Sequence, residues 1–364
     1  MTDDSRELEE KALAIHQKSV VVEGHCHLMK ELMTRREMGE KELFKTYYAP
    51  IFRKVGVRVA LLIIGGDNNS MVKGSDLLLW GALHVIDQVY EELAECSEVV
   101  QLCLKGADID VAMRQGKIAV ILGLEGGRPL EGRPMYDGLS SLRVFHRLGV
   151  RSLQLTGNGR NRLGDGIAES GTHGGLTRFG EAVVKEMNRL KMIIDISHLA
   201  PAGVNDVFRL TDGPIIASHS NARAVCDHPR NLDDDTIKRI AGRGGIVGLT
   251  FFSTLINKDV DLATPEDLAN HIDHIADLVG IDYVGLGPDF SEFTYQISQW
   301  SGTRGNMEGM EYGAKQNYFH PELKDWRHFR NLTKVLVRRG YSKESIQKVL
   351  GKNFLRVYRT VLGD

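Results

Sequence analysis

Short apolar runs that end in glycine, histidine, aspartate or asparagine recur along the chain, and each is followed by a stretch with helical spacing. The runs are rich in β-branched residues and almost continuously apolar, which is typical of strands buried on both faces of a parallel sheet. We count eight of them, at residues 19–28, 57–66, 118–127, 152–158, 192–198, 214–220, 245–252 and 283–290. Strands that alternate with helices predict an α/β fold, and eight such units predict a (β/α)8 TIM barrel.

Two of the intervening helices can be outlined from their own signals. Residues 178–191 carry apolar side chains four positions apart. Residues 264–280 begin with Thr264 as an N-cap, followed by a proline at the first helical position and by Asp267 at the capping-box position. His271 and His274 lie three apart on this helix. Because neither stands at a strand end, we interpret them as part of a solvated helix face rather than as a metal pair.

Length and composition favour one globular domain. The chain has 364 residues, of which 42% are hydrophobic and 26% charged, within the ordinary range for a folded protein. We expect a single barrel domain over residues 1–364. Within it we expect an N-terminal helix at 1–18, a long loop at 291–326 after the eighth strand, and C-terminal helices at 327–364.

Net charge and cysteine content indicate which kinds of partner and which cellular compartment to expect. A net charge of −2 gives no reason to expect nucleic acid or a membrane surface as partner. The acidic first nineteen residues lack the features of a secretory signal, and no apolar run reaches the ~20 residues of a membrane helix. The four cysteines are scattered without a CxxC pair, which fits a reducing compartment. We therefore expect a cytoplasmic protein.

Chemically capable side chains stand at the ends of the apolar runs. Because the active site of a (β/α)8 barrel is built at the carboxyl ends of its strands, these residues should meet. Taken singly, each has an ordinary alternative as a solvated carboxylate, a core histidine or a helix cap. Together, four imidazoles and two carboxylates predict a metal centre. In chain order the residues are His25, His27, Glu125, His198, His219 and Asp289.

The number of candidate ligands favours two metal ions. A single catalytic zinc ion uses three protein ligands and a water molecule, and six groups exceed that need. Two ions about 3.5–4 Å apart, bridged by a carboxylate and a hydroxide, fit the count. Glu125 lies between the two histidine sets in strand order and is the natural bridge. We expect two divalent metal ions, with zinc as the metal.

Longer motifs bring a resemblance to a known family. The segments at 175–200 and 215–231, "GLEGG" at 123–127 and "DYVGLGPDF" at 282–290 resemble the membrane (renal) dipeptidase family. That family is a binuclear, zinc-dependent branch of the amidohydrolase superfamily. The similarity runs in order from about residue 20 to "GKNFLRVY" at 351–358. It implies a hydrolase that cleaves the amide bond of a small dipeptide by attack of a metal-bridging hydroxide, and a possible homodimer.

The resemblance also implies a role for each site residue. One metal lies at the end of the first strand, the other lies between the fifth and sixth runs, and the glutamate of the third run bridges them. Asp289 is implied to handle protons beside the hydroxide. Arg230 matches the family arginine that receives the substrate carboxylate, a task that suits its planar fork. The implied metal ligands are His25, His27, Glu125, His198 and His219.

The chain departs from the family pattern at three positions. His27 stands where the family usually has aspartate, so the ligand set carries one negative charge less. Gly157 stands where a histidine usually holds the substrate carbonyl, and loss of such a donor typically costs ~10²–10³ in rate. Phe252 stands where some relatives have a substrate-contacting tyrosine. Three arginines are candidates to replace the missing donor: Arg128, Arg160 and Arg162.

These departures leave alternatives open. The leading hypothesis is a dipeptidase with Arg230, Phe252 and Gly157 on its substrate side. A second is an amidohydrolase acting on a non-dipeptide amide, such as an N-acyl amino acid or a lactam of a specialised metabolite. A third is a catalytically weak metal-binding homologue. Loops at 131–138 and 291–326 are expected to flank the pocket mouth, because loops after barrel strands carry specificity.

Overall fold

The computed structural model describes residues 3–67, 78–130, 139–290 and 319–364. Its strands are β1 Val21–Cys26, β2 Val57–Gly66, β3 Val100–Leu102, β4 Ile118–Glu125, β5 Val150–Gln154, β6 Ile193–Asp195, β7 Ile216–Ala217, β8 Ile246–Leu249 and β9 Val284–Leu286. Its α-helices are α1 Asp3–Gln17, α2 Leu28–Glu37, α3 Ala49–Lys54, α4 Leu78–Glu95, α5 Gly106–Arg114, α6 Leu139–Arg147, α7 Arg178–Leu190, α8 Pro201–Leu210, α9 Asp234–Gly242, α10 Ser253–Ile256, α11 Pro265–Val279, α13 Phe329–Arg338, α14 Lys343–Gln347 and α15 Asn353–Leu362.

Shorter helical turns connect these elements. The 3₁₀ turns are η2 Arg128–Leu130, η3 Ile167–Thr172, η4 Val260–Leu262, η5 Ile281–Tyr283 and η6 Trp326–His328. Two π-helical turns, η1 Phe44–Tyr48 and η7 Lys348–Lys352, precede α3 and α15. No helix among the described residues is long and apolar enough to span a membrane.

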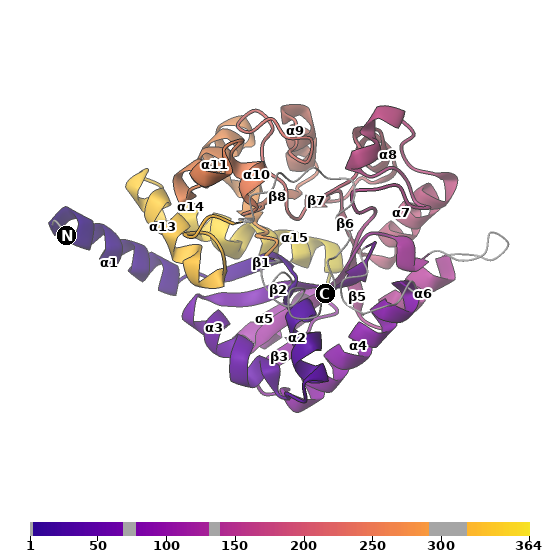
Figure 1. Cartoon of the computed structure of the whole chain (residues 1–364), viewed down its shortest axis with the longest axis horizontal. Coiled ribbons are helices and arrows are strands. Elements are labelled where there is room, and N and C mark those ends of the chain that lie inside the picture. Colours follow the sequence, from indigo (N-terminus) through magenta and orange to yellow (C-terminus); the bar gives the residue numbers. More distant parts are fainter. Residues whose placement is uncertain (1–2, 68–77, 131–138, 291–318) are drawn as a thin grey trace.

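The strands form a parallel barrel with the helices around it (Figure 1). Hydrogen-bonded neighbours follow the order β1-β2-β4-β5-β6-β7-β8-β9. The first and last strands of this order lie side by side, since a Cβ built on Gly24 would stand 2.6 Å from the carbonyl oxygen of Leu286. The predicted (β/α)8 barrel is therefore confirmed, and each of the eight apolar runs overlaps one of its strands.

One strand was not predicted. β3 pairs in parallel with the first half of β4, from Val100 opposite Ile118 to Leu102 opposite Val120, while β5 pairs with the second half of β4. With only three residues, β3 is too short to show a two-residue alternation. It extends the sheet beside β4 without changing the order of the barrel strands.

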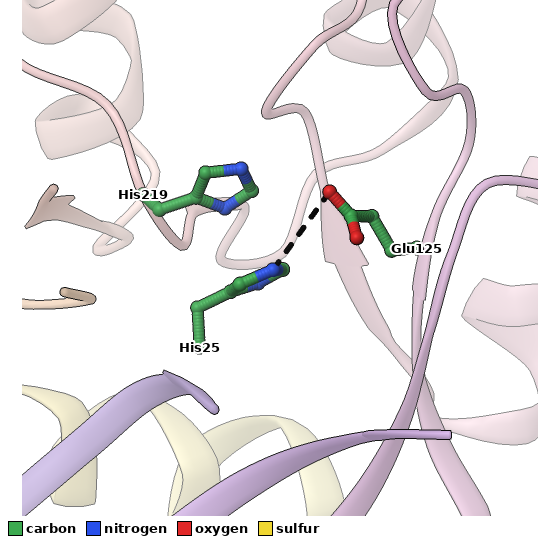
Figure 2. A group of neighbouring side chains, drawn as sticks. All are labelled: His25, Glu125 and His219. Atoms are coloured by element: carbon green, nitrogen blue, oxygen red, sulfur yellow. Dashed lines mark ion pairs between the residues drawn. The ribbon is translucent and has the colours of Figure 1, made fainter. Parts of the chain in front are cut away.

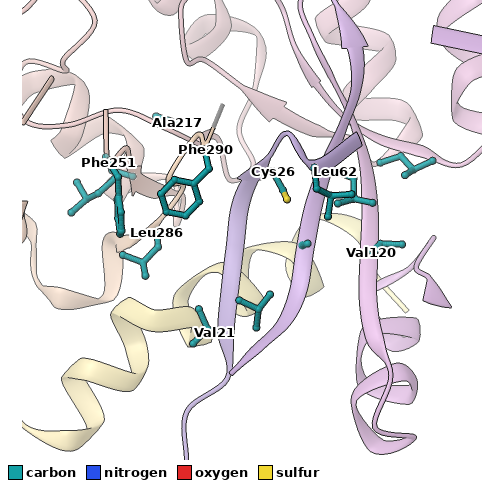
Figure 3. Close-up of a cluster of buried hydrophobic side chains, with 14 of the residues drawn as sticks. Val21, Cys26, Leu62, Val120, Ala217, Phe251, Leu286 and Phe290 are labelled. Carbon is teal, nitrogen blue, oxygen red and sulfur yellow. The ribbon is translucent and has the colours of Figure 1, made fainter. Parts of the chain in front are cut away.

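Alternating side chains of the strands build two apolar layers, as the two-residue period of a strand requires. On β2 and β4, one set of residues faces the surrounding helices and belongs to the outer core; it includes Ala60, Leu62, Val120 and Leu122. Figure 3 shows part of this outer core around Cys26, Leu62 and Phe290. The alternate residues form the inner layer with α15 and include Val59, Leu61, Ala119 and Ile121.

Phe354 of α15 closes the bottom of the barrel. A Cβ on Gly24 or Gly285 would come within 2.6 Å of its ring, and one on Gly248 within 2.8 Å. These approaches are shorter than real Cβ contacts, so glycine is required at each position for the phenylalanine ring to fit. The floor of the barrel is therefore filled by an aromatic side chain, and the polar groups are left to the opposite end.

The first strand is less regular than its sequence predicts. The pairing of β1 with β2 shifts register between Glu23 and Cys26. Trp326 Nε1 donates a hydrogen bond to Glu23 Oε2 at 2.5 Å, and Trp326 belongs to the outer core. Strict alternation along the strand would place Glu23 on the same face as His25 and His27, but the register shift interrupts that alternation and Glu23 contacts the outer core instead.

The capping signals of α11 are confirmed, but the expectation for its histidines is wrong in part. Thr264 Oγ1 accepts a hydrogen bond from the backbone N–H of Asp267, as a capping box requires. His271 is fully buried: its Nδ1 accepts from the Ala222 backbone N–H at 3.1 Å, and its Nε2 faces the Ile256 carbonyl at 3.0 Å. The helix packs this histidine against the segments after β7 and β8, so that it ties loops together instead of facing solvent.

Candidate metal centre

The six polar residues predicted at strand ends converge at the carboxyl end of the barrel. Two overlapping sets of three could each hold a metal ion, because their nitrogen and oxygen atoms lie within 4.8 Å of one another. Figure 2 shows the first set, with the side chains of two strand ends and one loop turned toward a common point. The sets are His25, Glu125 and His219, and His25, His27 and Asp289.

The first histidine pair comes from β1 and the residue that follows it. His25 and His27 are buried, and their Nε2 atoms lie 3.2 Å apart. His25 Nδ1 faces the hydroxyl of Ser218 at 3.1 Å. His27 Nδ1 is buried without a hydrogen-bond partner among the described residues. The His25 ring is therefore fixed by a contact at Nδ1, whereas the His27 ring has no such contact.

The second pair comes from the segments that follow β6 and β7. His198 and His219 bring their Nε2 atoms within 2.8 Å of each other. His198 Nδ1 faces Asn158 Oδ1 at 2.5 Å, and His219 Nδ1 faces Ser218 Oγ at 2.8 Å. Because the Asn158 oxygen accepts a hydrogen bond, His198 must carry its proton on Nδ1. That tautomer leaves the Nε2 lone pair free to bind a metal.

Glu125 at the end of β4 reaches both pairs. Its Oε1 lies 3.4 Å from His198 Nε2 and 3.9 Å from His25 Nε2. Its Oε2 lies 3.5 Å from His27 Nε2. A carboxylate with one oxygen toward each of two neighbouring sites has the geometry of a bridging ligand.

Asp289 lies beside the first pair in a strained backbone conformation. Its Oδ1 is 3.0 Å from His27 Nε2 and 4.0 Å from His25 Nε2. Its φ angle is 62°, and His198 has a φ of 66°. A non-glycine residue in this region is held there at a cost of about 1–3 kcal/mol, and such strain gathers at functional sites. Two site residues share this conformation.

Burial sets the protonation of the cluster. It lowers the pKa of all four imidazoles well below the usual value, so the histidines are neutral and able to bind metal. Burial, followed by the negative charge of Asp289, raises the pKa of the Glu125 carboxyl. Burial also raises the pKa of Asp289, opposed by the neighbouring His25, Lys30 and Arg230 charges. Without a cation between them, the two carboxylates repel each other when both are ionised.

The donor set fits two divalent metal ions. Four neutral imidazoles and two carboxylates are the ligand types that zinc and similar metals prefer. Three of the four imidazoles have an oxygen at Nδ1, which is the outer hydrogen bond that metal-binding histidines usually make. Nε2 atoms that face one another at 2.8 and 3.2 Å have lone pairs that a cation would satisfy. The family resemblance assigns His25 with His27 to one ion and His198 with His219 to the other, while by distance His25 also groups with Glu125 and His219.

Arg230 lies next to this cluster. It is 7% exposed, and its Nη2 donates to the His219 carbonyl at 3.3 Å. It lines a pocket together with His198, Ser220 and apolar side chains that include Ile167 and Leu199. The Ser220 hydroxyl is fully buried there and has no hydrogen-bond partner among the described residues. The pocket thus offers the Arg230 guanidinium and an unused hydroxyl beside a candidate metal ligand.

Gly157 lies against Asp67, at the end of β2. The Gly157 backbone N–H donates to Asp67 Oδ2 at 2.8 Å, and a Cβ on Gly157 would stand 3.1 Å from the Asp67 Cβ. Asp67 also accepts from the Arg128 backbone N–H at 2.9 Å and from Asn161. The aspartate therefore joins the segments after β4 and β5 and takes up the space beside position 157.

The three arginines considered as replacements for the position-157 donor are engaged elsewhere. Arg160 forms an ion pair with Asp165 at 2.5 Å. Arg162 lies over the Phe179 ring, and Arg128 Nη2 donates to the carbonyl of Arg160. Phe252, at the N-cap of α10 after β8, packs edge-on against Phe319. The loops expected at the pocket mouth, 131–138 and most of 291–326, lie outside the described residues.

Several residues of the site were not anticipated from sequence. Ser218 and Asn158 contact the Nδ1 atoms of candidate ligand histidines, and each lies beside a residue that was singled out. Lys30, on the first turn of α2, is near enough for its charge to act on Glu125 and Asp289. A signal existed only for the serine, because the dipeptide Ser-His occurs at 197–198 and again at 218–219.

Comparison with known proteins gives consistent results. The family model described as membrane dipeptidase (peptidase family M19) matches residues 9–303 and 309–362. Dipeptidase tcpJ of Claviceps purpurea is 32% identical over 277 residues, which are 76% of this chain and 59% of that relative. Dipeptidase aclJ of Aspergillus oryzae is 37% identical over 251 residues, which are 68% of this chain and 52% of that relative. The matched region thus spans little more than half the length of these two relatives.

A solved structure supports the fold. A metallopeptidase from Rhodobacter sphaeroides, liganded with a phosphinate mimic of the dipeptide L-Ala-D-Ala, superposes with a TM-score of 0.76 at 22% identity. The superposition covers 94% of this chain and 100% of that one. The family resemblance predicted from the sequence motifs is confirmed. Since the family model spans nearly the whole sequence, the chain belongs to the membrane dipeptidase family, peptidase family M19.

Proposed function

We propose that this protein is a binuclear metal-dependent hydrolase that cleaves the amide bond of a small dipeptide. The observation that carries the proposal is the convergence of four neutral imidazoles and two carboxylates at the carboxyl end of the barrel. Family membership and the names of the curated relatives support the same reaction class. The solved relative with a bound dipeptide mimic supports the same substrate class.

His25 and His27 would hold a first ion and His198 and His219 a second, with Glu125 between them. Two bound divalent ions, zinc being the expected metal, would supply an activated water and polarise the scissile carbonyl. The protein keeps the histidine ligands neutral and orients their Nε2 atoms toward the ions. Burial keeps the imidazoles deprotonated on one nitrogen, and the outer hydrogen bonds of three of them fix which nitrogen it is.

Asp289 is the proposed proton-transfer group. Its Oδ1 stands 3.0 Å from His27 Nε2, within the cluster and not at its edge. Burial raises the pKa of Asp289, so that the carboxyl can accept a proton from the attacking water and deliver it to the leaving amine. Its left-handed backbone fixes the direction of the side chain.

Arg230 is the proposed receptor for the C-terminal carboxylate of the substrate. Its guanidinium is almost entirely buried, beside the second histidine pair. In such a site a bidentate pair with a carboxylate is strong and directional. The buried Ser220 hydroxyl in the same pocket offers a further hydrogen bond to a bound group. Gly157 and Phe252 complete the proposed substrate side but contribute no side-chain donor.

The test uses the purified full chain loaded with zinc and a library of L-Xaa-L-Xaa and L-Xaa-D-Xaa dipeptides. We expect turnover of some members and a loss of about 10²–10⁴ in kcat in Asp289→Asn with both metals retained. Metal content by mass spectrometry separates loss of the proton-transfer group from loss of the ions. A library in which nothing turns over above the Asp289→Asn background would refute the dipeptidase proposal.

A second candidate is hydrolysis of a non-dipeptide amide, such as an N-acyl amino acid or a lactam. It is favoured by Gly157, whose neighbour Asp67 occupies the adjacent space, and by the engagement of Arg160 and Arg162 elsewhere. Preference for an N-acyl group over a free α-amine would support this candidate. A catalytically weak metal-binding homologue is less consistent with a carboxylate placed as Asp289 is, because a structural metal site has no need of a proton carrier.

The proposal extends to the setting of the protein. We place residues 1–364 in one barrel domain that acts on a small molecule in the cytoplasm, without nucleic acid or membrane as partner and with a homodimer as a possible assembly. The net charge of −2 and four free, buried cysteines support this setting. Fractionation and light scattering of the native protein test it.

A further inference from the structure

One buried hydroxyl touches an imidazole of each proposed metal site. Ser218 Oγ lies 3.1 Å from His25 Nδ1 and 2.8 Å from His219 Nδ1. His25 belongs to β1, whereas His219 follows β7, so the contact joins distant strands of the barrel. The two imidazole rings lie 3.8 Å apart between centroids, and the serine is fully buried beneath them.

The hydrogen-bonding capacity of serine matches this position. A hydroxyl has one hydrogen to donate and two lone pairs to accept with. If both imidazoles donate from Nδ1, the two lone pairs are used and the hydroxyl hydrogen must point elsewhere. A carboxylate is available for it, because Asp195 lies at the end of the neighbouring strand β6 and is 2% exposed.

Asp195 is already turned toward this serine. Its Oδ1 accepts the backbone N–H of Ser218 at 3.0 Å and that of Ser197 at 2.9 Å. Burial raises the pKa of Asp195, and hydrogen bonds from the hydroxyls and backbone N–H groups of the same two serines oppose that shift. The chain Asp195–Ser218–imidazole therefore has every donor matched to an acceptor, with the ring protons on Nδ1 and the ring lone pairs on Nε2.

We propose that Ser218 is a positioning residue common to both metal sites, whose single hydroxyl accepts hydrogen bonds from His25 and His219 and holds both rings with Nε2 toward the ions. This inference rests on the proposed roles of the two histidines as ligands. It goes beyond them in making the two sites interdependent. A change at this one atom should disturb one ligand of each ion, whereas His198 has a separate partner in Asn158.

The experiment measures metal binding rather than turnover. Metal-free full-length protein is titrated with Zn²⁺ against a chromophoric chelator, and the dissociation constant of each site is extracted. Outer hydrogen-bond partners of metal ligands are typically worth 10–100-fold in affinity. In Ser218→Ala we expect both constants to rise by about that factor. Ser218→Thr keeps the hydroxyl and should restore much of the loss.

Ser197→Ala is the matched control. Ser197 is also fully buried and immediately precedes a proposed ligand. Its hydroxyl lies 3.5 Å from Ser218 Oγ and accepts from the His219 backbone N–H at 3.2 Å, but it contacts no imidazole ring nitrogen in the described hydrogen bonds. It should leave both constants near those of the unaltered protein. A second readout is the downfield proton NMR spectrum of the zinc-loaded protein, in which Ser218→Ala should shift or broaden two imidazole N–H signals.

The outcomes separate this inference from the proposed function. If the unaltered chain binds no zinc with useful affinity, the proposed metal centre is wrong. If the unaltered chain binds two ions and Ser218→Ala binds them equally well, the metal centre stands and the role of Ser218 is refuted. Weakening of one site alone also refutes the shared role, as does an equal loss in Ser197→Ala.

Discussion

The two histidine pairs of the candidate centre resemble each other at Nε2 and differ at Nδ1. In both pairs the Nε2 atoms face each other, at 3.2 Å for His25 and His27 and at 2.8 Å for His198 and His219. In the second pair both rings have an oxygen at Nδ1. In the first pair His25 shares the Ser218 hydroxyl, while His27 Nδ1 is buried without a partner in the described structure.

This difference falls where the chain departs from its family. The family resemblance places aspartate at position 27, and a carboxylate needs no partner behind it of the kind an imidazole N–H needs. A buried polar group without a hydrogen bond costs about 1–3 kcal/mol. His27 thus adopts the position of a ligand without the support that fixes the other three rings. A single substitution can exchange one metal-ligating side chain for another. A hydrogen-bond partner for the new side chain requires a second substitution at a different position.

Removing one ring from each pair is the strongest test of this comparison. We expect His198→Ala to lose the second ion and His27→Ala to lose the first, with affinity at the affected site reduced by more than about 100-fold, beyond the effect of an outer partner. Mass spectrometry of the purified variants should find one metal per chain in each. If His27→Ala keeps two metals and full activity, His27 is not a ligand and the two pairs are not equivalent.

Removing the support of the second pair should make it behave like the first. Asn158→Ala leaves His198 Nδ1 without its acceptor, and we expect the affinity of the second site to fall about 10–100-fold. Asn158→Asp keeps an oxygen at that position and serves as the matched control. Equal affinities in Asn158→Ala and the unaltered chain would show that Nδ1 partners do not distinguish the pairs.

The carboxylates between the pairs should give metal binding a pH dependence that the imidazoles do not. The raised pKa values of Glu125 and Asp289 mean that the metal-free protein retains a proton there at a pH where a free carboxyl is ionised. A metal must displace that proton, so affinity should rise with pH by about tenfold per unit for each proton released. The histidines, whose pKa is lowered, contribute no such proton near neutrality.

Calorimetry in buffers of different ionisation enthalpy counts the protons released on metal binding. Glu125→Gln should release fewer than the unaltered chain and bind more weakly. Affinity that stays constant from pH 6 to pH 8, in both proteins, would contradict the raised pKa of the carboxyl groups.

The smallest expected effect comes from restoring the family residue. His27→Asp places a negative charge beside Asp289, whose Oδ1 lies 3.0 Å from His27 Nε2. A like charge raises the pKa of a carboxyl, so the acid limb of the pH–rate profile should move upward by about half a unit. Metal retention should improve, because the substitution removes the buried His27 Nδ1, which has no hydrogen-bond partner in the described structure. An acid limb that moves downward would show that Asp289 is not the group that titrates.

Most of the barrel and the convergence of the six candidate ligands could be predicted from the sequence, because both depend on a local pattern of apolar runs that end in polar residues. Apolar runs place the strands, and the fold brings their ends together whatever the loops do. The three-residue β3 and the register shift in β1 could not be predicted, since each involves too few residues to show a period. Burial of His271 was missed because contacts with segments elsewhere in the sequence leave no local signal.

The outer hydrogen bonds of the site belong to the same class of unpredictable detail. Ser218, Asn158 and Asp67 act through partners far away in the sequence, and a lone serine or asparagine beside a histidine is common in any chain. The sequence shows that Gly157 has no side chain to donate a hydrogen bond. It does not show that Asp67 occupies the adjacent space. The ends of the strands predict which side chains form the candidate site. The residues that orient those side chains are determined by tertiary packing and cannot be predicted in the same way.

The position of Phe354 bears on how the protein is made. Its ring fits against glycines of β1, β8 and β9, so residues 353–362 complete a floor whose first strand leaves the ribosome more than three hundred residues earlier, at Val21–Cys26. Until α15 packs against these glycines, we expect the inner apolar layer that includes Val22, Leu61 and Ile121 to stay exposed to solvent in the growing chain, where such surface favours aggregation.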